Sequence, residues 1–364
     1  KCLIVWAYQT ASPQRALRTR RRPFKNLREL RVLSGEQMFS PSFWTLPKMC
    51  NQPCEGSLRK VPYKINDTLI PQSFLHSIVY PHIMNTMQKV SAQPRFTNLS
   101  RLFVPIAAIL VFAVWFSFAP PGLLGKADAV GYAICHRIDE RSFQIEERQL
   151  PLCARCTGEF FAAGISLLFF AVVSPRKSGM PGWKLGAPLL LFFLAFGMDG
   201  SNSYLYLIKE TSGSALANIP NLYVPNNTLR LFTGSGMGIA LASILYPAWN
   251  QSTWKEVDTG RALDWKKLGA LIGIVLLADF AVLSESPIVL YPIAILSVLG
   301  VLALLTMVFS MVWILLMRQE NEITSLKQMW LPFLAGITLA LLMISGIDLL
   351  RYQLTGTWGG FPLG

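Results

Sequence analysis

A series of long apolar segments that carry almost no charge constrains this chain more than any other feature. A helix needs about 20 mostly apolar residues to cross a bilayer, and seven segments meet or approach that length: residues 102–125, 157–175, 185–208, 231–254, 268–284, 286–317 and 328–347. The fifth is short and contains Asp279. Only 15% of the 364 residues are charged, against roughly 25% in ordinary soluble domains. The sequence therefore predicts an all-α, polytopic transmembrane helical bundle with about seven spans, embedded in a lipid bilayer.

The composition divides the chain into four parts. Residues 1–83 show no sustained helical or alternating period, which indicates a disordered basic extension. Because residue 1 is Lys and Met84 and Met87 open a short polar leader, we expect translation to begin at one of these methionines. Residues 1–83 are then upstream sequence, and a genuine extension is the alternative. Residues 84–101 form the leader, 102–250 a core membrane domain, and 251–364 three further membrane helices.

Most of the excess positive charge of the chain lies in its first part. Of the net charge of +13, the first 83 residues contribute 13 Lys and Arg against 4 Asp and Glu, and residues 84–364 carry only +4. A charge of that size is ordinary for a membrane protein. We therefore expect the lipid bilayer as the main partner and no nucleic acid, and the sequence identifies no protein partner.

The Lys and Arg residues of the loops indicate the orientation of the bundle. With the leader inside, the inside segments carry 12 of them and the outside segments carry 8, and cytoplasmic loops are the ones enriched in these residues. We expect a multi-pass protein of the cell (cytoplasmic) membrane with its N-terminus inside. Helix order then places the loop between the first two spans at the outer face, together with Glu159, Asp199, Arg230, Asp279, Glu285, Asp348 and Arg351.

The loop between the first two spans carries the most specific chemical motif. It contains Cys135, His136, Cys153 and Cys156, which are all of the cysteines and the one histidine of residues 84–364. Three cysteines and a histidine grouped in one loop, with Cys153 and Cys156 in a C-x-x-C motif, favour a metal site. Three thiolates and one imidazole suit zinc, with iron as the alternative. A haem attachment would need His directly after the C-x-x-C, where the chain has Thr157.

Other interpretations of these cysteines stay open. Cys153 and Cys156 lie where the second span begins, and the helix N-terminus and Arg155 favour thiolates there. Thiolates of this kind serve thiol–disulfide exchange as well as metal binding, and the cysteines could also be buried structural residues. Because neighbouring side chains diverge, Cys135 and His136 are awkward joint ligands, so a site of three cysteines with His136 beside it is a further alternative.

A second polar group is expected near the same membrane face. Asp199 begins a polar face on the third span, and Arg230 begins the fourth span. We expect an ion pair between them, with a catalytic or a purely structural role. Gly234 and Gly238 have the spacing that lets membrane helices approach closely. Asp348 and Arg351 are expected to form a structural pair at the end of the last span.

These motifs resemble a family of predicted bacterial and archaeal membrane proteins, domain of unknown function 2085. The resemblance rests on Cys135-His136, on Arg141-Ser142-Phe143 and on PLCARCTG at 151–158, with Asp199 and NTLRLFTG at 227–234 as weaker matches. It covers about residues 125–250 and implies no established activity.

The sequence thus predicts an integral membrane protein with a Cys/His metal site at one membrane face. The first hypothesis is a membrane-embedded enzyme that acts on a lipid-soluble substrate, with Asp199 and Arg230 as catalytic residues. The second is a membrane thiol–disulfide oxidoreductase that uses the C-x-x-C. The third is a non-catalytic, zinc-stapled assembly or transport subunit.

Overall fold

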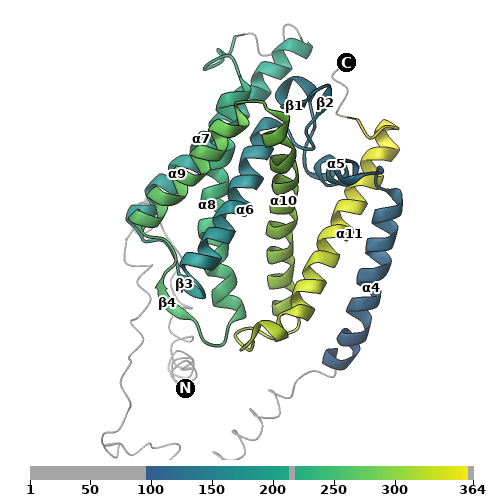
Figure 1. The fold of residues 1–364 in the computed structure, drawn as a ribbon, viewed down its shortest axis with the longest axis vertical. Helices are drawn as coiled ribbons and strands as arrows, with labels where there is room; N and C mark the ends of the chain where they lie inside the picture. The colour runs from purple at the N-terminus through teal and green to yellow at the C-terminus, as the bar shows by residue number, and fades with distance from the viewer. Residues whose placement is uncertain (1–95, 213–217, 360–364) are drawn as a thin grey trace, which may run out of the picture. The chain divides into compact units, whose positions relative to one another are not determined.

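A computed structural model describes residues 96–212 and 218–359 of the chain (Figure 1). The chain divides into two units between residues 83 and 84, and every described residue belongs to the second. The predictions for residues 1–83, including the start of translation, fall outside the described residues, as does most of the leader.

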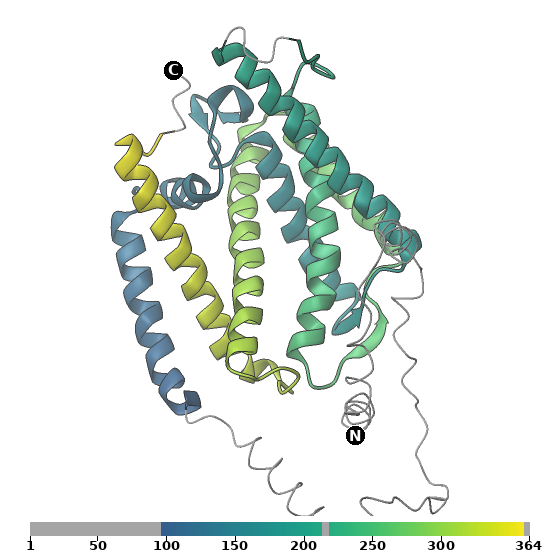
Figure 2. The same cartoon turned by 180° about the vertical axis from the view of Figure 1, so that it is seen from behind.

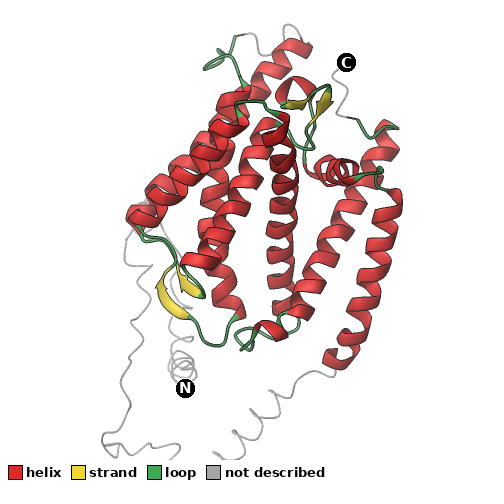
Figure 3. Cartoon of the chain, viewed as in Figure 1, coloured by secondary structure: helices red, strands yellow, loops and turns green. Residues whose placement is uncertain are grey.

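The described chain is mostly helical (Figure 3). Its α-helices are α4 (Phe96–Phe118), α5 (Leu123–Ile134), α6 (Ala154–Val173), α7 (Trp183–Ser212), α8 (Asn227–Thr253), α9 (Trp265–Val282), α10 (Pro287–Leu316) and α11 (Trp330–Thr355). Two short 3₁₀ turns, η4 (Asp139–Arg141) and η5 (Leu326–Gln328), lie between them. The strands β1 (Gln144–Ile145) and β2 (Arg148–Gln149) pair antiparallel, and β3 (Lys177–Gly179) pairs parallel with β4 (Asp258–Arg261). The all-α prediction is confirmed.

Six of these helices, α4, α6, α7, α8, α10 and α11, are long and apolar enough to cross a membrane. The count is close to the seven spans predicted. The predicted span that is not among the six is α9, whose 18 residues include Lys266, Lys267 and Asp279. The helices α4, α7, α9 and α11 nevertheless run toward the end that holds β1 and β2, and α6, α8 and α10 run away from it (Figures 1 and 2). The α5–α6 loop and the ends of α7, α9 and α11 therefore share one end of the bundle.

The prediction of one continuous span over residues 102–125 is wrong. Helix α4 ends at Phe118, and the sequence Pro120-Pro121-Gly122 separates it from α5. Proline removes a backbone donor and breaks a helix, and Gly122 has a φ of 81°, which other residues rarely adopt. Helix α5 is seen almost end-on beside α11 where the long helices lie in the plane of the view (Figure 1). This turn brings the C-terminal end of α5 to the start of α6.

Helix α6 lies between α8 and α10 at the centre of the bundle (Figures 1 and 2). Glycines allow the contact with α8 to be very close. A Cβ atom added at Gly234 would lie 2.1 Å from the carbonyl oxygen of Arg155, and one added at Gly238 would lie 2.2 Å from that of Glu159. The predicted close approach at the two glycines is therefore confirmed, and it fixes the first turns of α6 against α8.

Candidate metal centre

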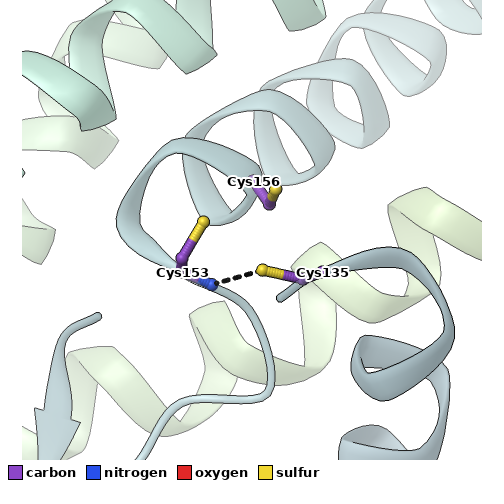
Figure 4. Close-up of side chains that lie close together, drawn as sticks. All are labelled: Cys135, Cys153 and Cys156. Atoms are coloured by element: carbon purple, nitrogen blue, oxygen red, sulfur yellow. Dashed lines mark hydrogen bonds between the residues drawn. The ribbon is translucent and has the colours of Figure 1, made fainter. Parts of the chain in front are cut away.

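Three cysteines from two stretches of the chain meet at one end of the bundle (Figure 4). Cys135 follows the last residue of α5, Cys153 immediately precedes α6, and Cys156 lies in the first turn of α6. Their sulfur atoms lie within 4.8 Å of one another, and all three are free thiols. Thiolates about 2.3 Å from a tetrahedral zinc ion stand about 3.8 Å apart. Small side-chain movements therefore bring the three sulfurs around one ion.

The loop between Cys135 and Cys153 is folded so that its two ends meet. A Cβ added at Gly131 would lie 1.9 Å from the carbonyl oxygen of Pro151, so the absence of a side chain there lets the end of the loop pack against α5. Leu152 is fully buried, and its carbonyl oxygen accepts a hydrogen bond of 3.1 Å from the hydroxyl of Thr157. These contacts place the backbone N–H of Cys153 3.3 Å from the sulfur of Cys135.

The pKa of each thiol depends on the other two. The sulfur of Cys135 accepts hydrogen bonds from the thiols of Cys153 and Cys156 and from the backbone N–H groups of Cys153 and Arg137, and these bonds lower the pKa of Cys135 well below its usual value. The hydrogen bond to Cys135 and burial raise the pKa of Cys153 to about 11. A cation that binds the three sulfurs would displace the protons of the thiols.

The surroundings of the cluster are apolar. Cys135 is buried, and the half-buried Cys153 and Cys156 pack against the same group of side chains. That group comes from α5, α10, α11 and the loop and includes Ala127, Val130, Leu152, Val298, Val301 and Ile344. Such surroundings disfavour a charged thiolate, so thiolates at this place would need a bound cation to neutralise them.

The fourth predicted ligand, His136, lies apart from the sulfurs. Its side chain is exposed, and the group of metal-binding side chains within the described residues consists of the three cysteines. The backbone carbonyl of His136 accepts a hydrogen bond of 3.0 Å from Arg351. The structure therefore has the arrangement that the sequence left as an alternative, with three cysteines together and His136 beside them.

Arg351 joins the end of α11 to the chain around Cys135. Its guanidinium donates hydrogen bonds to the carbonyl oxygens of Tyr132 and Cys135, at 2.5 Å and 2.6 Å. The sequence predicted an ion pair of Arg351 with Asp348, and the described ion pairs do not include one. Helix α11 thus holds the cysteine-bearing end of α5 in place.

Asp199 forms an ion pair with Arg155, not with Arg230 as the sequence predicted. Arg155 donates from Nε to Asp199 Oδ2 at 2.8 Å and also from a terminal nitrogen to the same oxygen. The other carboxylate oxygen accepts a bond of 2.7 Å from the hydroxyl of Tyr223. Arg230 donates instead to Oδ1 of Asn227, at 2.8 Å. This pairing has a physical cause. The close contact between α6 and α8 places the first turn of α6, which contains Arg155, next to α7.

The pair of Arg155 with Asp199 was missed because Arg155 was considered only as a charge that favours thiolates. Its position between two cysteines of the C-A-R-C sequence was the available signal, since it lies in the first turn of α6. Asp128 was not among the predicted site residues. It forms ion pairs with Arg137 at 3.0 Å and with Arg148 at 2.6 Å, so it fixes both ends of the β1–β2 region to α5.

Comparison with known proteins identifies relatives of this part of the chain. A family model described as predicted membrane protein (DUF2085) matches residues 135–244, which begin at Cys135 and include Arg230. An uncharacterized protein of Methanothermobacter thermautotrophicus is 30% identical over 109 residues, which cover 30% of this chain and 81% of that protein. No solved structure matches the chain.

Proposed function

This chain belongs to the DUF2085 family of predicted membrane proteins, and we propose that it is a membrane-embedded metalloenzyme that acts on a lipid-soluble substrate. Cys135, Cys153 and Cys156 hold one zinc ion, or iron in its place. The observation that carries the proposal is the meeting of three thiol sulfurs within 4.8 Å at one end of a helical bundle.

The number of ligands favours a catalytic over a structural ion. Structural zinc sites are closed by four protein ligands, whereas catalytic sites have three protein ligands and one open position. Three thiols form the group in the described residues, and the His136 side chain is exposed. A bound zinc ion supplies Lewis acidity. The third sequence-based hypothesis, a zinc-stapled subunit, requires a fourth ligand and is supported less well.

The number of clustered cysteines favours a metal over disulfide exchange. A redox C-x-x-C motif needs two thiols. Here the sulfur of a third cysteine, Cys135, lies within 4.8 Å of both motif sulfurs, and all three thiols are free. The thiol–disulfide oxidoreductase is therefore the second candidate.

We assign the polar group beside the cysteines to substrate binding and catalysis. Asp199 is 1% exposed and is held by Arg155, which lies between two of the cysteines. Arg230 is also buried, and its Nε has no hydrogen-bond partner within the described part of the chain. In this proposal Asp199 is an acid–base group, and Arg230 orients a polar group of the substrate.

The proposal includes an orientation in the membrane. The chain is a multi-pass protein of the cell membrane with its N-terminus inside, and the cysteine cluster lies at the outer face. The support is the excess of Lys and Arg in the loops at the opposite end of the bundle.

Metal content and its dependence on single cysteines test the proposal. We expect the full chain, purified anaerobically in detergent, to contain about one zinc or iron per chain by elemental analysis. Cys135→Ser, Cys153→Ser and Cys156→Ser should each lose the metal, because each removes a thiolate ligand. His136→Ala is the matched control and should retain it. Metal-free wild-type protein, or serine variants with full metal content, would overturn the proposal.

A further inference from the structure

A cavity lies between α4 and α11, outside the cysteine cluster. Its volume is about 490 Å³, within the roughly 300–1,000 Å³ of typical small-molecule pockets. Its lining includes Val114 and Phe118 of α4 and Leu349 of α11, and these three side chains are exposed on the surface of the bundle. Since both helices are long and apolar enough to cross a membrane, the cavity opens toward lipid.

Three polar groups of this lining lack hydrogen-bond partners. Asp348 is the acidic residue of the lining and is only 4% exposed. Its Oδ1, the hydroxyl of Ser345 and the indole nitrogen of Trp115 have no hydrogen-bond partner among the described residues. Burying such groups without a hydrogen bond is unfavourable. A ligand that pairs with them would relieve this cost.

These polar groups come from the C-terminal halves of the two helices. Trp115 lies in the last turn of α4, and Ser345 and Asp348 lie in the second half of α11. Both helices end on the side of the bundle that holds the cysteines (Figures 1 and 2). A ligand that pairs with these groups would place its apolar body against Val114, Phe118 and Leu349, which are exposed on the surface of the bundle.

We propose that this cavity binds the hydroxyl head of a lipid-soluble alcohol or phenol that enters from the bilayer. A hydroxyl can donate a hydrogen bond to Asp348 and accept one from the indole N–H of Trp115, and Ser345 can serve either way. An ammonium group cannot accept from Trp115. The described residues of the lining include no cationic side chain, so a carboxylate or phosphate would be buried there without a counter-charge. This inference is independent of the metal centre and names a site beyond it.

Photolabelling with competition tests the proposal. The probe is a 12-carbon alcohol with a mid-chain diazirine, added to the full-length protein in phosphatidylcholine nanodiscs. An alcohol with about 12 carbons is chosen because its size is close to that of the ligands that fill pockets of this volume. Peptide mass spectrometry should find labelling in the last turns of α4 and α11. Unlabelled dodecanol should compete about tenfold better than its methyl ether, as expected for one hydrogen bond to a charged group.

Variants connect the labelling to named groups. Asp348→Ala and Ser345→Ala should each weaken labelling, and Val114→Trp should block it by filling the cavity. Asp279→Asn is the matched control, because Asp279 is a buried carboxyl in α9 whose Oδ1 accepts a 2.7 Å hydrogen bond from Ser235; it should leave labelling unchanged. Equal competition by alcohol and ether, with labelling unaffected in Asp348→Ala and Ser345→Ala, would mean filling by bulk lipid tails and would overturn the proposal. Stronger competition by dodecylamine than by dodecanol would overturn the hydroxyl assignment.

Discussion

Arg155 of α6 binds Asp199 of α7 through two of its guanidinium nitrogens. The carboxylate is 1% exposed, and Arg155 also donates to the hydroxyl of Ser203 at 3.0 Å. Because Arg155 lies between Cys153 and Cys156, the pair ties the cysteine-bearing turn of α6 to α7. The stability of the bundle and the geometry of the cysteine cluster therefore depend on the same contact.

We predict strong coupling between Asp199 and Arg155. Loss of either partner leaves an uncompensated buried charge, which costs about 3–5 kcal/mol. Asp199→Asn combined with Arg155→Gln should therefore be clearly less destabilising than the sum of the single substitutions. The unfolding free energies of the four proteins in detergent micelles measure the coupling. If the loss of unfolding free energy in the double variant lay within about 0.5 kcal/mol of the sum of the two single losses, direct pairing would be contradicted.

The matched control for this cycle replaces Arg230, which donates to Asn227. Asp199→Asn and Arg230→Gln should be nearly additive, because the structure has no ion pair between these residues among those described. Coupling in this second cycle as large as in the first would restore the pairing that the sequence alone predicted.

We predict that Gly234→Ala separates α6 from α8 and disturbs the cysteine cluster. The new methyl group would meet the carbonyl oxygen of Arg155 at 2.1 Å, and overpacking of this kind costs about 1–3 kcal/mol or more. The variant should unfold at lower temperature and bind less metal. Gly273→Ala in α9 is the control, because nothing lies within 4 Å of its added Cβ, and it should behave like wild type. Equal effects of the two substitutions would contradict the packing.

We predict that Tyr223 ionises only at unusually high pH. Burial and the hydrogen bond to Asp199 raise its pKa to about 12, from a usual value of 10. Since the folded-state pKa is above the unfolded one, this contribution to stability is complete below pH 10 and is lost as the pH rises toward 12. The difference in tyrosinate absorbance between wild type and Tyr223→Phe should rise near pH 12. Between pH 10 and pH 12 the variant should lose less unfolding free energy than wild type. A rise near pH 10 would show that Tyr223 is not bound to Asp199.

We predict that the loop of the cysteine cluster faces away from the cytosol. Exposed Glu147 of this loop and exposed Glu256 at the opposite end of the bundle are matched sites for a reporter cysteine. A membrane-impermeant maleimide should label Glu147→Cys in intact cells, and it should label Glu256→Cys only after permeabilisation. The reverse pattern would show that the orientation is inverted.

The sequence predicted the parts of this protein that depend on composition and local spacing. Charge-free segments revealed the membrane helices, because any charge within the hydrocarbon region is costly. The motif around Cys135, Cys153 and Cys156 predicted a grouping of these cysteines, and their sulfur atoms lie within 4.8 Å of one another. The close helix contact at Gly234 also followed from spacing, because small residues four apart lie on one helix face.

The partners of single charged residues could not be predicted, because they depend on how helices rotate against one another. The sequence pattern placed Asp199 and Arg230 at one membrane face, whereas the packing of α6 against α8 brings Arg155 to Asp199. Helix α5 was missed for a different reason. Apolar residues run past Pro120 without a charge, so the hydropathy pattern hid the break that the prolines and Gly122 produce.

The coordination sphere of the bound metal tests the central claim most directly. X-ray absorption on anaerobically purified, full-length protein should give three sulfur neighbours at about 2.3 Å and one lighter nitrogen or oxygen neighbour around zinc. Thiol counting on the same denatured sample should find Cys135, Cys153 and Cys156 all reduced. Metal-free protein in which Cys153 and Cys156 form a disulfide would contradict the account and establish the redox alternative in its place.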